Sequence, residues 1–290
     1  MKLLIIADQE GCSGVLPSQS NSERNLLMQK QVSSVLADIE ADWQITVLDC
    51  HDNGLNLFPI KEKFPHINIV SQLWNFNVKE HYDGAIFVGF HVARNEDSPF
   101  AHTFRTEIIK TMLNGENVGE VTLLTQWLQS NHIPVLWING EETLRIESEK
   151  LNIPFVSNIE LMNGKLNFNF HVAMEYSDIN AVSIRLVHEK LLDAFPDQLF
   201  QKSAGYIIFR NIDDYLNHLS EVSIFLNAAR NYYVMYFKKL INRIKWSYSR
   251  EEIEEMHDKR LSEIIFHSSI FSLRNDDLAY IESVIIKNSI

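Results

Sequence analysis

The chain has 290 residues, of which 46% are hydrophobic and 22% are charged, which permits a large packed core and excludes wholesale disorder. Its formal net charge of −12 argues against nucleic acid and anionic membranes as partners, because phosphate groups attract basic patches. No apolar run approaches the roughly 20 residues that cross a bilayer, and the N-terminal run is too short for a signal peptide.

The first half of the chain alternates short apolar runs with helical patterns. Helical spacing of apolar residues occurs over 25–39 and again over 121–128. Continuous apolar runs typical of buried strands lie at 3–7, 45–48, 67–70, 84–89 and 133–138. Such an alternation predicts an α/β fold with a mostly parallel central sheet flanked by helices.

The second half has a different pattern and predicts a smaller α+β lobe. Asn163-Gly164 is typical of a turn between two short strands, residues 179–192 have helical spacing, and 204–209 have strand character. From about residue 213 the pattern is helical, with a helix N-terminus near Ser249. We expect a catalytic domain over 1–160 and a lobe over 161–290 that shapes the substrate site and mediates oligomerisation.

Acidic and histidine side chains follow several of the predicted strands. The carboxyl ends of parallel strands meet at one edge of the sheet, where the reactive groups of open α/β proteins collect. Residues two apart in an extended segment point to the same side, which brings Asp8 and Glu10 together. The complete set at this edge comprises Asp8, Glu10, His51, His91, His102 and, at the start of a predicted helix, Glu120.

Carboxylates and imidazoles together suit zinc or a similar divalent ion. With Asp8, Glu10, His51, His91 and Glu120 as ligands, the three carboxylates carry three negative charges. Two divalent ions and one bridging hydroxide would balance them, which favours two ions over one. Taken singly, each residue also has an ordinary structural explanation, as a helix cap, a satisfied histidine or a first-turn charge. Spacing alone leaves both interpretations open.

Five segments of the chain resemble, in order, the motifs of the D-aminopeptidase family, the DppA-type metallopeptidases. The opening segment 8–14, DQEGCSG, is similar to the family's D-x-E-G-x-x-G, and 49–51, DCH, resembles its D-S-H. The segment 89–94, GFHVAR, resembles G-Y-H-A-R with one extra residue, and His102-Thr103 is similar to S-H-S. The fifth segment, 114–120, NGENVGE, resembles I-N-D-x-x-V-G-E. The resemblance covers about residues 1–150.

The resemblance implies a dizinc peptidase that releases N-terminal D-amino acids from short peptides and forms ring-like homo-oligomers. Carried over position by position, Asp8 would bridge the two zinc ions, and Glu10, His51, His91 and Glu120 would complete their ligand shells. His102 would be the catalytic histidine, as acid, base or nucleophile. Two such ions can lower the pKa of a bridging water and polarise the scissile carbonyl.

The chain departs from the family's pattern in three places. The family has G-L-N-A after its glutamate, whereas Glu120 is followed here by Val121-Thr122-Leu123-Leu124. The lysine-containing V-K segment has no convincing counterpart, the nearest stretch being 171–175. The C-terminal third, with its aromatic run 232–237, is also unlike the family. These differences concern the substrate and leave the metal ligands intact.

Two alternatives therefore accompany the aminopeptidase hypothesis. The first is an amidohydrolase of the same fold that acts on a modified small molecule or a biosynthetic intermediate. The second is a non-catalytic metal-binding protein, against which the presence of His102 argues. Cys12 and Cys50 are too few for a disulfide framework, and we expect reduced thiols in a cytoplasmic protein, with packing favoured over reactivity.

Overall fold

The computed structural model describes residues 1–94, 98–105, 107–164, 166–169, 181–186, 191–192 and 195–227. The chain divides into two compact units. The first comprises Met1–Phe104, Lys110–Ser183 and Phe209–Leu219, and it contains every predicted site residue. The predicted division of roles between 1–160 and 161–290 stays a prediction.

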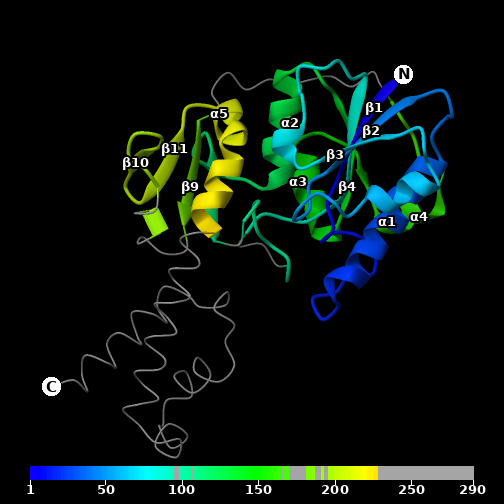
Figure 1. Cartoon of the computed structure of the whole chain (residues 1–290), viewed down its shortest axis with the longest axis horizontal. Coiled ribbons are helices and arrows are strands. Elements are labelled where there is room, and N and C mark those ends of the chain that lie inside the picture. The colour runs from blue at the N-terminus through cyan, green and yellow to red at the C-terminus, as the bar shows by residue number, and fades with distance from the viewer. Residues whose placement is uncertain are drawn as a thin grey trace, which may run out of the picture. The chain divides into compact units, whose positions relative to one another are not determined.

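The first unit is built on a six-stranded sheet in which all five neighbouring pairs of strands run parallel. The interior strands are buried on both faces, which explains their continuous apolar sequences. Figure 1 shows the sheet, and its strand order is β3-β2-β1-β4-β7-β8. The strands are β1 (Lys2–Ala7), β2 (Gln44–Asp49), β3 (Asn68–Ser71), β4 (Gly84–Phe90), β7 (Val135–Gly140) and β8 (Phe155–Val156). The predicted mostly parallel sheet is confirmed.

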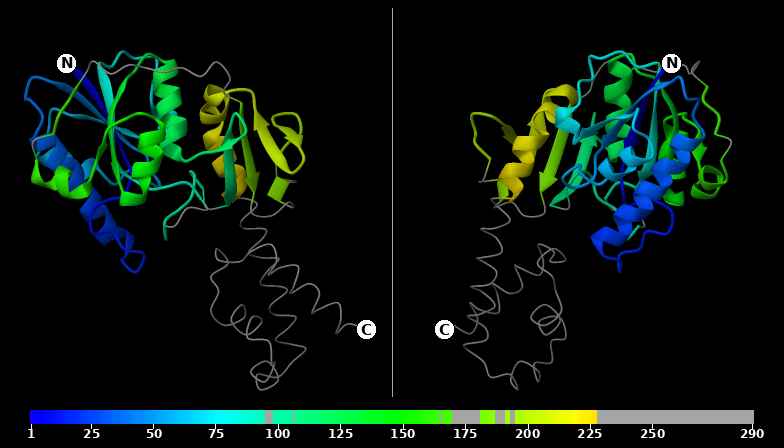
Figure 2. Two further views of the ribbon diagram at one scale, coloured as in Figure 1. Left: turned by 180° about the vertical axis from the view of Figure 1, so that it is seen from behind. Right: turned by 45° about the vertical axis from the view of Figure 1, so that its right-hand side comes forward.

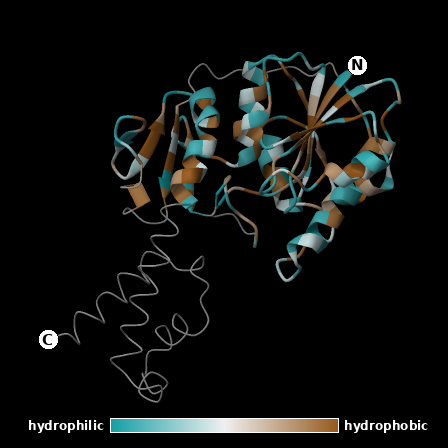
Figure 3. Cartoon of the chain, in the orientation of Figure 1, coloured by the Kyte–Doolittle hydropathy of each residue, from teal (hydrophilic) through white to brown (hydrophobic). Residues whose placement is uncertain are grey.

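Helices cover both faces of this sheet. In two views α1 (Asn21–Ala37) and α4 (Asn158–Asn163) lie on one face, and α2 (Glu120–Ser130) lies on the other (Figures 1 and 2). Helix α1 begins at a capping box in which Ser20 and Glu23 satisfy each other's backbone N–H groups. The strands are predominantly hydrophobic, whereas α1 alternates polar and apolar positions (Figure 3). The remaining short helices are α3 (Arg145–Lys150), α5 (Ile212–Asn217) and the 3₁₀ helices η1 (Phe58–Glu62), η2 (Leu73–Asn75) and η3 (Glu142–Leu144).

A second sheet has the strand order β10-β11-β9-β5-β6. Its strands are β5 (Ile108–Leu113), β6 (Glu116–Asn117), β9 (Val182–Leu186), β10 (Gln201–Ser203) and β11 (Tyr206–Phe209). The β5–β6 and β10–β11 pairs are antiparallel. The predicted strand over 204–209 begins two residues late, because Ala204 and Gly205 adopt positive φ angles of 49° and 84° in the β10–β11 turn.

Two predictions of local structure are wrong. The helix expected over 179–192 is the strand β9 at residues 182–186, where buried Val182, Ile184 and Leu186 alternate with more exposed residues, a period of two. Gly164, expected in a strand–strand turn, instead caps the C-terminus of α4 with a φ of 74°. The predictions for 171–175, 232–237 and Ser249 lie outside the described residues.

Within the described part of the chain, no helix has the length and apolar character needed to cross a membrane.

Candidate metal centre

The segment after β1, which contains the predicted ligands Asp8 and Glu10, packs closely against the backbone of β4. Asp8 N–H donates to Val88 O at 2.9 Å, and Gly11 N–H donates to Gly89 O at 2.8 Å, so the loop after β1 follows β4. A Cβ atom on Gly11 would lie 1.7 Å from Phe90 O, a distance that no side chain can accommodate. The glycine after Glu10 is therefore required by the approach of β4.

Three of the predicted ligands meet at the ends of β1 and β2. His51 Nδ1 lies 3.3 Å from Asp8 Oδ1 and 2.9 Å from Glu10 Oε2. Asp8 is buried, while Glu10 and His51 are partly exposed. The expectation that Asp8 and Glu10 face the same side fits these distances, since both carboxylates reach one imidazole.

The other two ligands meet at the end of β4 and the start of α2. His91 Nε2 lies 3.5 Å from Glu120 Oε1 and 3.6 Å from Asp8 Oδ2. The ring of His102 stacks on that of His91 with centroids 4.2 Å apart, and His102 Nε2 is 3.9 Å from Glu120 Oε1. Asp8 therefore has one carboxylate oxygen toward His51 and the other toward His91, and all six predicted residues form one cluster.

Backbone carbonyls orient two of the three histidines. His91 Nδ1 lies 2.9 Å from Val92 O, and His102 Nδ1 lies 2.7 Å from Phe100 O. Because a carbonyl can only accept, both Nδ1 atoms carry a proton, and Nε2 is the nitrogen that each ring presents to the carboxylates. Outer hydrogen bonds of this kind are typical of metal-binding histidines.

In the metal-free cluster, protons on the histidines and on Asp8 offset the negative charge of the carboxylates. Burial, reinforced by the negative charge of Glu10, raises the pKa of Asp8 to about 7. Burial opposes protonation of the two ligand histidines, but hydrogen bonds and charges from the carboxylates outweigh it and raise the pKa of His51 to about 11 and that of His91 to about 10. Burial and the neighbouring His91 lower the pKa of His102. His51 and His91 thus hold protons that a bound cation would replace.

The donor set fits zinc. Among the described residues, Asp8 Oδ2 is buried and has no hydrogen-bond partner, which leaves an acceptor directed into the cluster. Ligand atoms of Asp8, Glu10 and His91 lie within 4.8 Å of one another, and so do those of His91, His102 and Glu120. Oxygen and nitrogen donors in two such groups suit divalent zinc.

Both cysteines next to the ligands are packing residues. Cys12 is buried and its Sγ donates to Asp8 O at 3.2 Å. Burial and the nearby carboxylates raise the pKa of the Cys12 and Cys50 thiols well above their usual value. Neither thiol is therefore a reactive thiolate near neutral pH, as the sequence favoured.

Two carboxylates that support the site were not assigned a role from the sequence. Asp49 is fully buried and accepts hydrogen bonds from Asn56 N, Leu57 N and His51 N at 2.7, 3.0 and 3.3 Å. Its place in the same DCH segment as His51 was a signal that could have found it. Glu141 accepts from Val92 N at 2.7 Å and so holds the segment after His91. Its only signal is its position directly after the strand β7.

The family model for D-aminopeptidases matches residues 1–173, more than half of the chain and the whole metal cluster. The chain belongs to the D-aminopeptidase family. A curated relative in this family, the D-aminopeptidase of Bacillus subtilis (strain 168), is 27% identical over 172 residues. That match covers 54% of this chain and 62% of the relative, so it spans less than two thirds of the relative's length.

A solved structure extends the likeness to the fold. The zinc-dependent D-aminopeptidase DppA of Bacillus subtilis, a self-compartmentalizing protease, matches with a TM-score of 0.61. The match covers 79% of this chain and 98% of that one, at 18% sequence identity. The two proteins therefore share a fold, as expected for members of the D-aminopeptidase family.

Proposed function

We propose that this chain is a dinuclear zinc aminopeptidase that releases N-terminal D-amino acids from short peptides. The observation that carries the proposal is the position of Asp8 between two groups of donors. One of its oxygens faces His51 at 3.3 Å, and the other faces His91 at 3.6 Å. A carboxylate with donors on both sides is suited to bridging two cations.

In this proposal, Asp8 would be shared by two zinc ions, and Glu10, His51, His91 and Glu120 would complete their ligand shells. Two bound zinc ions would supply Lewis acidity toward the scissile carbonyl and an activated water. The chain holds these donor atoms in place. Its three carboxylates also compensate most of the positive charge of two divalent ions.

His102 is the proposed catalytic histidine. Its side chain is 17% exposed, against 1% for His91, so it lies at the accessible edge of the cluster. The Phe100 carbonyl fixes its ring, and its lowered pKa keeps it neutral near pH 7. A neutral imidazole in this place can take a proton from the attacking water and pass it to the leaving amine. The proximity of His102 Nε2 to Glu120 Oε1 would also allow it to serve as a zinc ligand.

The proposed peptide substrate is inferred from the family. It is also consistent with the buried position of the residues after Glu120, where the chain departs from the family's pattern. Val121, Leu123 and Leu124 replace three residues of the family's G-L-N-A segment, and all three are fully buried in α2. These substitutions belong to the core, so they give no reason to abandon a peptide substrate. The amidohydrolase alternative depends on the altered second half of the chain, whose segments 171–175 and 232–237 lie outside the described residues.

A single experiment tests the proposal. Purified zinc-loaded protein is incubated with matched D- and L-aminoacyl amides and dipeptides, and release of the free N-terminal residue is measured. We expect release from D-substrates. Release from none of them, with zinc bound, would overturn the aminopeptidase assignment and leave the amidohydrolase and the non-catalytic metal-binding protein as the two alternatives.

We also propose that the protein acts as a homo-oligomer, a proposal supported by the description of DppA as a self-compartmentalizing protease. Light scattering during size-exclusion chromatography tests this, because a mass equal to the 33.7 kDa of one chain would contradict it.

A further inference from the structure

The N-terminus of α2 is capped by a side chain from another helix. Gly119 is the N-cap residue and offers no side chain of its own. Instead, Glu147 of α3 accepts from Thr122 N–H at 3.1 Å and from Thr122 Oγ1 at 2.5 Å. Its carboxylate therefore satisfies one of the free N–H groups at the positive end of the helix, that of Thr122.

The helix turn that Glu147 caps is the one that carries Glu120. Glu120 is the first residue of α2, and its Oε1 accepts from Phe104 N–H at 2.6 Å while facing His91 Nε2 at 3.5 Å. Any shift of the first turn of α2 moves this carboxylate relative to His91. The cap and the proposed ligand are thus joined through one helical turn.

Gly119 makes the approach of Glu147 possible. A Cβ atom at position 119 would lie 2.8 and 3.0 Å from the two carboxylate oxygens of Glu147, and 3.2 Å from Ala93 N. A side chain there would press on the cap and on the segment that follows His91. Position 119 is therefore a glycine because the carboxylate of Glu147 occupies the space that a side chain would need.

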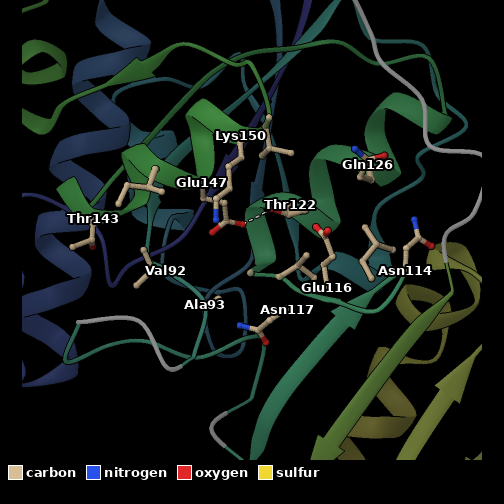
Figure 4. A pocket seen from close by; sticks show the side chains of 15 residues that line it. Val92, Ala93, Asn114, Glu116, Asn117, Thr122, Gln126, Thr143, Glu147 and Lys150 are labelled. Carbon is tan, nitrogen blue, oxygen red and sulfur yellow. Dashed lines mark hydrogen bonds between the residues drawn. The ribbon is translucent and has the colours of Figure 1, made fainter.

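Glu147 also forms part of the wall of a cavity of about 470 Å³ (Figure 4). The dashed line in that view marks its bond to Thr122, and Val92, Ala93 and Gly119 line the same cavity. None of the six proposed site residues lines it. Glu147 is thus outside the reacting groups, and its hydrogen bonds connect it to them through the first turn of α2.

We propose that Glu147 is a positioning residue for the metal centre, which holds the carboxylate of Glu120 in place by capping α2. This inference rests on the proposed role of Glu120 as a zinc ligand. The loss of such an outer hydrogen-bonding partner typically lowers metal affinity by about 10–100-fold. A role confined to stability would lower the melting temperature and leave the zinc affinity unchanged.

The test measures zinc affinity by competition with a chromophoric chelator, together with the thermal unfolding of the zinc-free protein. Glu147→Gln removes the charge at nearly constant size, and Glu147→Leu removes the acceptor. We expect zinc affinity to fall about 10–100-fold in Glu147→Leu, with a smaller fall in Glu147→Gln. The control is Glu149→Gln, which makes the same charge change at an exposed position of α3 and should match the unchanged protein.

The outcomes separate this inference from the proposed function. Glu120→Gln is measured in parallel and should lose most of its zinc affinity. If Glu120→Gln binds zinc normally, the ligand assignment is wrong and the positioning role is overturned with it. If Glu120→Gln loses zinc while both Glu147 variants retain full affinity, only the positioning role is overturned. Should the Glu147 variants fail to fold, Thr122→Val removes a single hydrogen bond of the cap, and an unchanged zinc affinity would then contradict the role.

Discussion

Asp49 offers the sharpest test of how the fold holds its metal ligands. Its carboxylate lies fully buried at the end of β2 and receives hydrogen bonds from Asn56 N, Leu57 N and Asn56 Nδ2, as well as from the backbone N–H of His51. Asp49→Asn keeps the shape of the side chain but replaces one acceptor oxygen with an NH₂ group. The remaining oxygen can serve Asn56 N and Leu57 N, which are the two shortest contacts at 2.7 and 3.0 Å.

The cost follows from the donors that lose their acceptor. His51 N–H and Asn56 Nδ2 would then face an NH₂ group, and each donor left unpaired costs about 1–3 kcal/mol. The lower limit, about 2 kcal/mol for both, corresponds to a fall in Tm of about 4–8 °C for a chain of this size. Because His51 would also lose the hydrogen bond that its backbone N–H donates to Asp49, we expect zinc affinity to fall about 10–100-fold.

Thermal unfolding with and without zinc, and zinc titration against a chelator, measure both effects. Asp52→Asn is the matched control, since it removes the same charge from an exposed position in the same loop. The reasoning is wrong if Asp49→Asn unfolds at the same temperature and binds zinc as tightly as Asp52→Asn does.

Three further predictions concern the centre itself. His102→Ala should keep its zinc content but lose about 10²–10⁴-fold in turnover, and loss of zinc instead would make His102 a ligand. In zinc-free protein, the raised pKa values of His51 and His91 stabilise the fold fully below the ordinary value of 6.5, and this stabilisation is lost as the pH rises toward about 10 and 11. Melts in a chelator should therefore show Tm falling between pH 7 and 10, and a flat profile would contradict the charge balance. Gly11→Ala, whose Cβ would lie 1.7 Å from Phe90 O, should lower Tm far more than Gly14→Ala, which has no close contact but carries the backbone cost of a φ of 79°. Equal effects of the two variants would contradict the close approach of β4.

The parallel sheet was predictable because its strands are buried on both faces, which leaves continuous apolar runs such as 3–7 and 84–89 in the sequence. The grouping of the candidate site residues was predictable for a related reason, since Asp8, Glu10, His51 and His91 follow strands and Glu120 begins a helix, whereas His102 lies one loop further on. The strand β9 was predicted as a helix because Ile179, Val182 and Leu186, three and four residues apart, fit a helical spacing in the longer window from 179 to 192.

Asp49 and Glu147 differ in how far their roles could be predicted from local sequence patterns. Asp49 bonds to residues in its own loop and shares a segment with His51, so its role is nearly local. Glu147 lies 25 residues from Thr122 in the sequence, and only the packing of α3 beside the start of α2 brings them together. No spacing within a segment encodes that contact.

The central claim is that Asp8 is shared by two zinc ions. The most direct measurement is the zinc content per chain of the purified protein, determined by elemental analysis after dialysis, with Asp8→Ala alongside. The account predicts two zinc ions per chain, and close to none in Asp8→Ala. One ion per chain, or an Asp8→Ala variant that retains both, would contradict it.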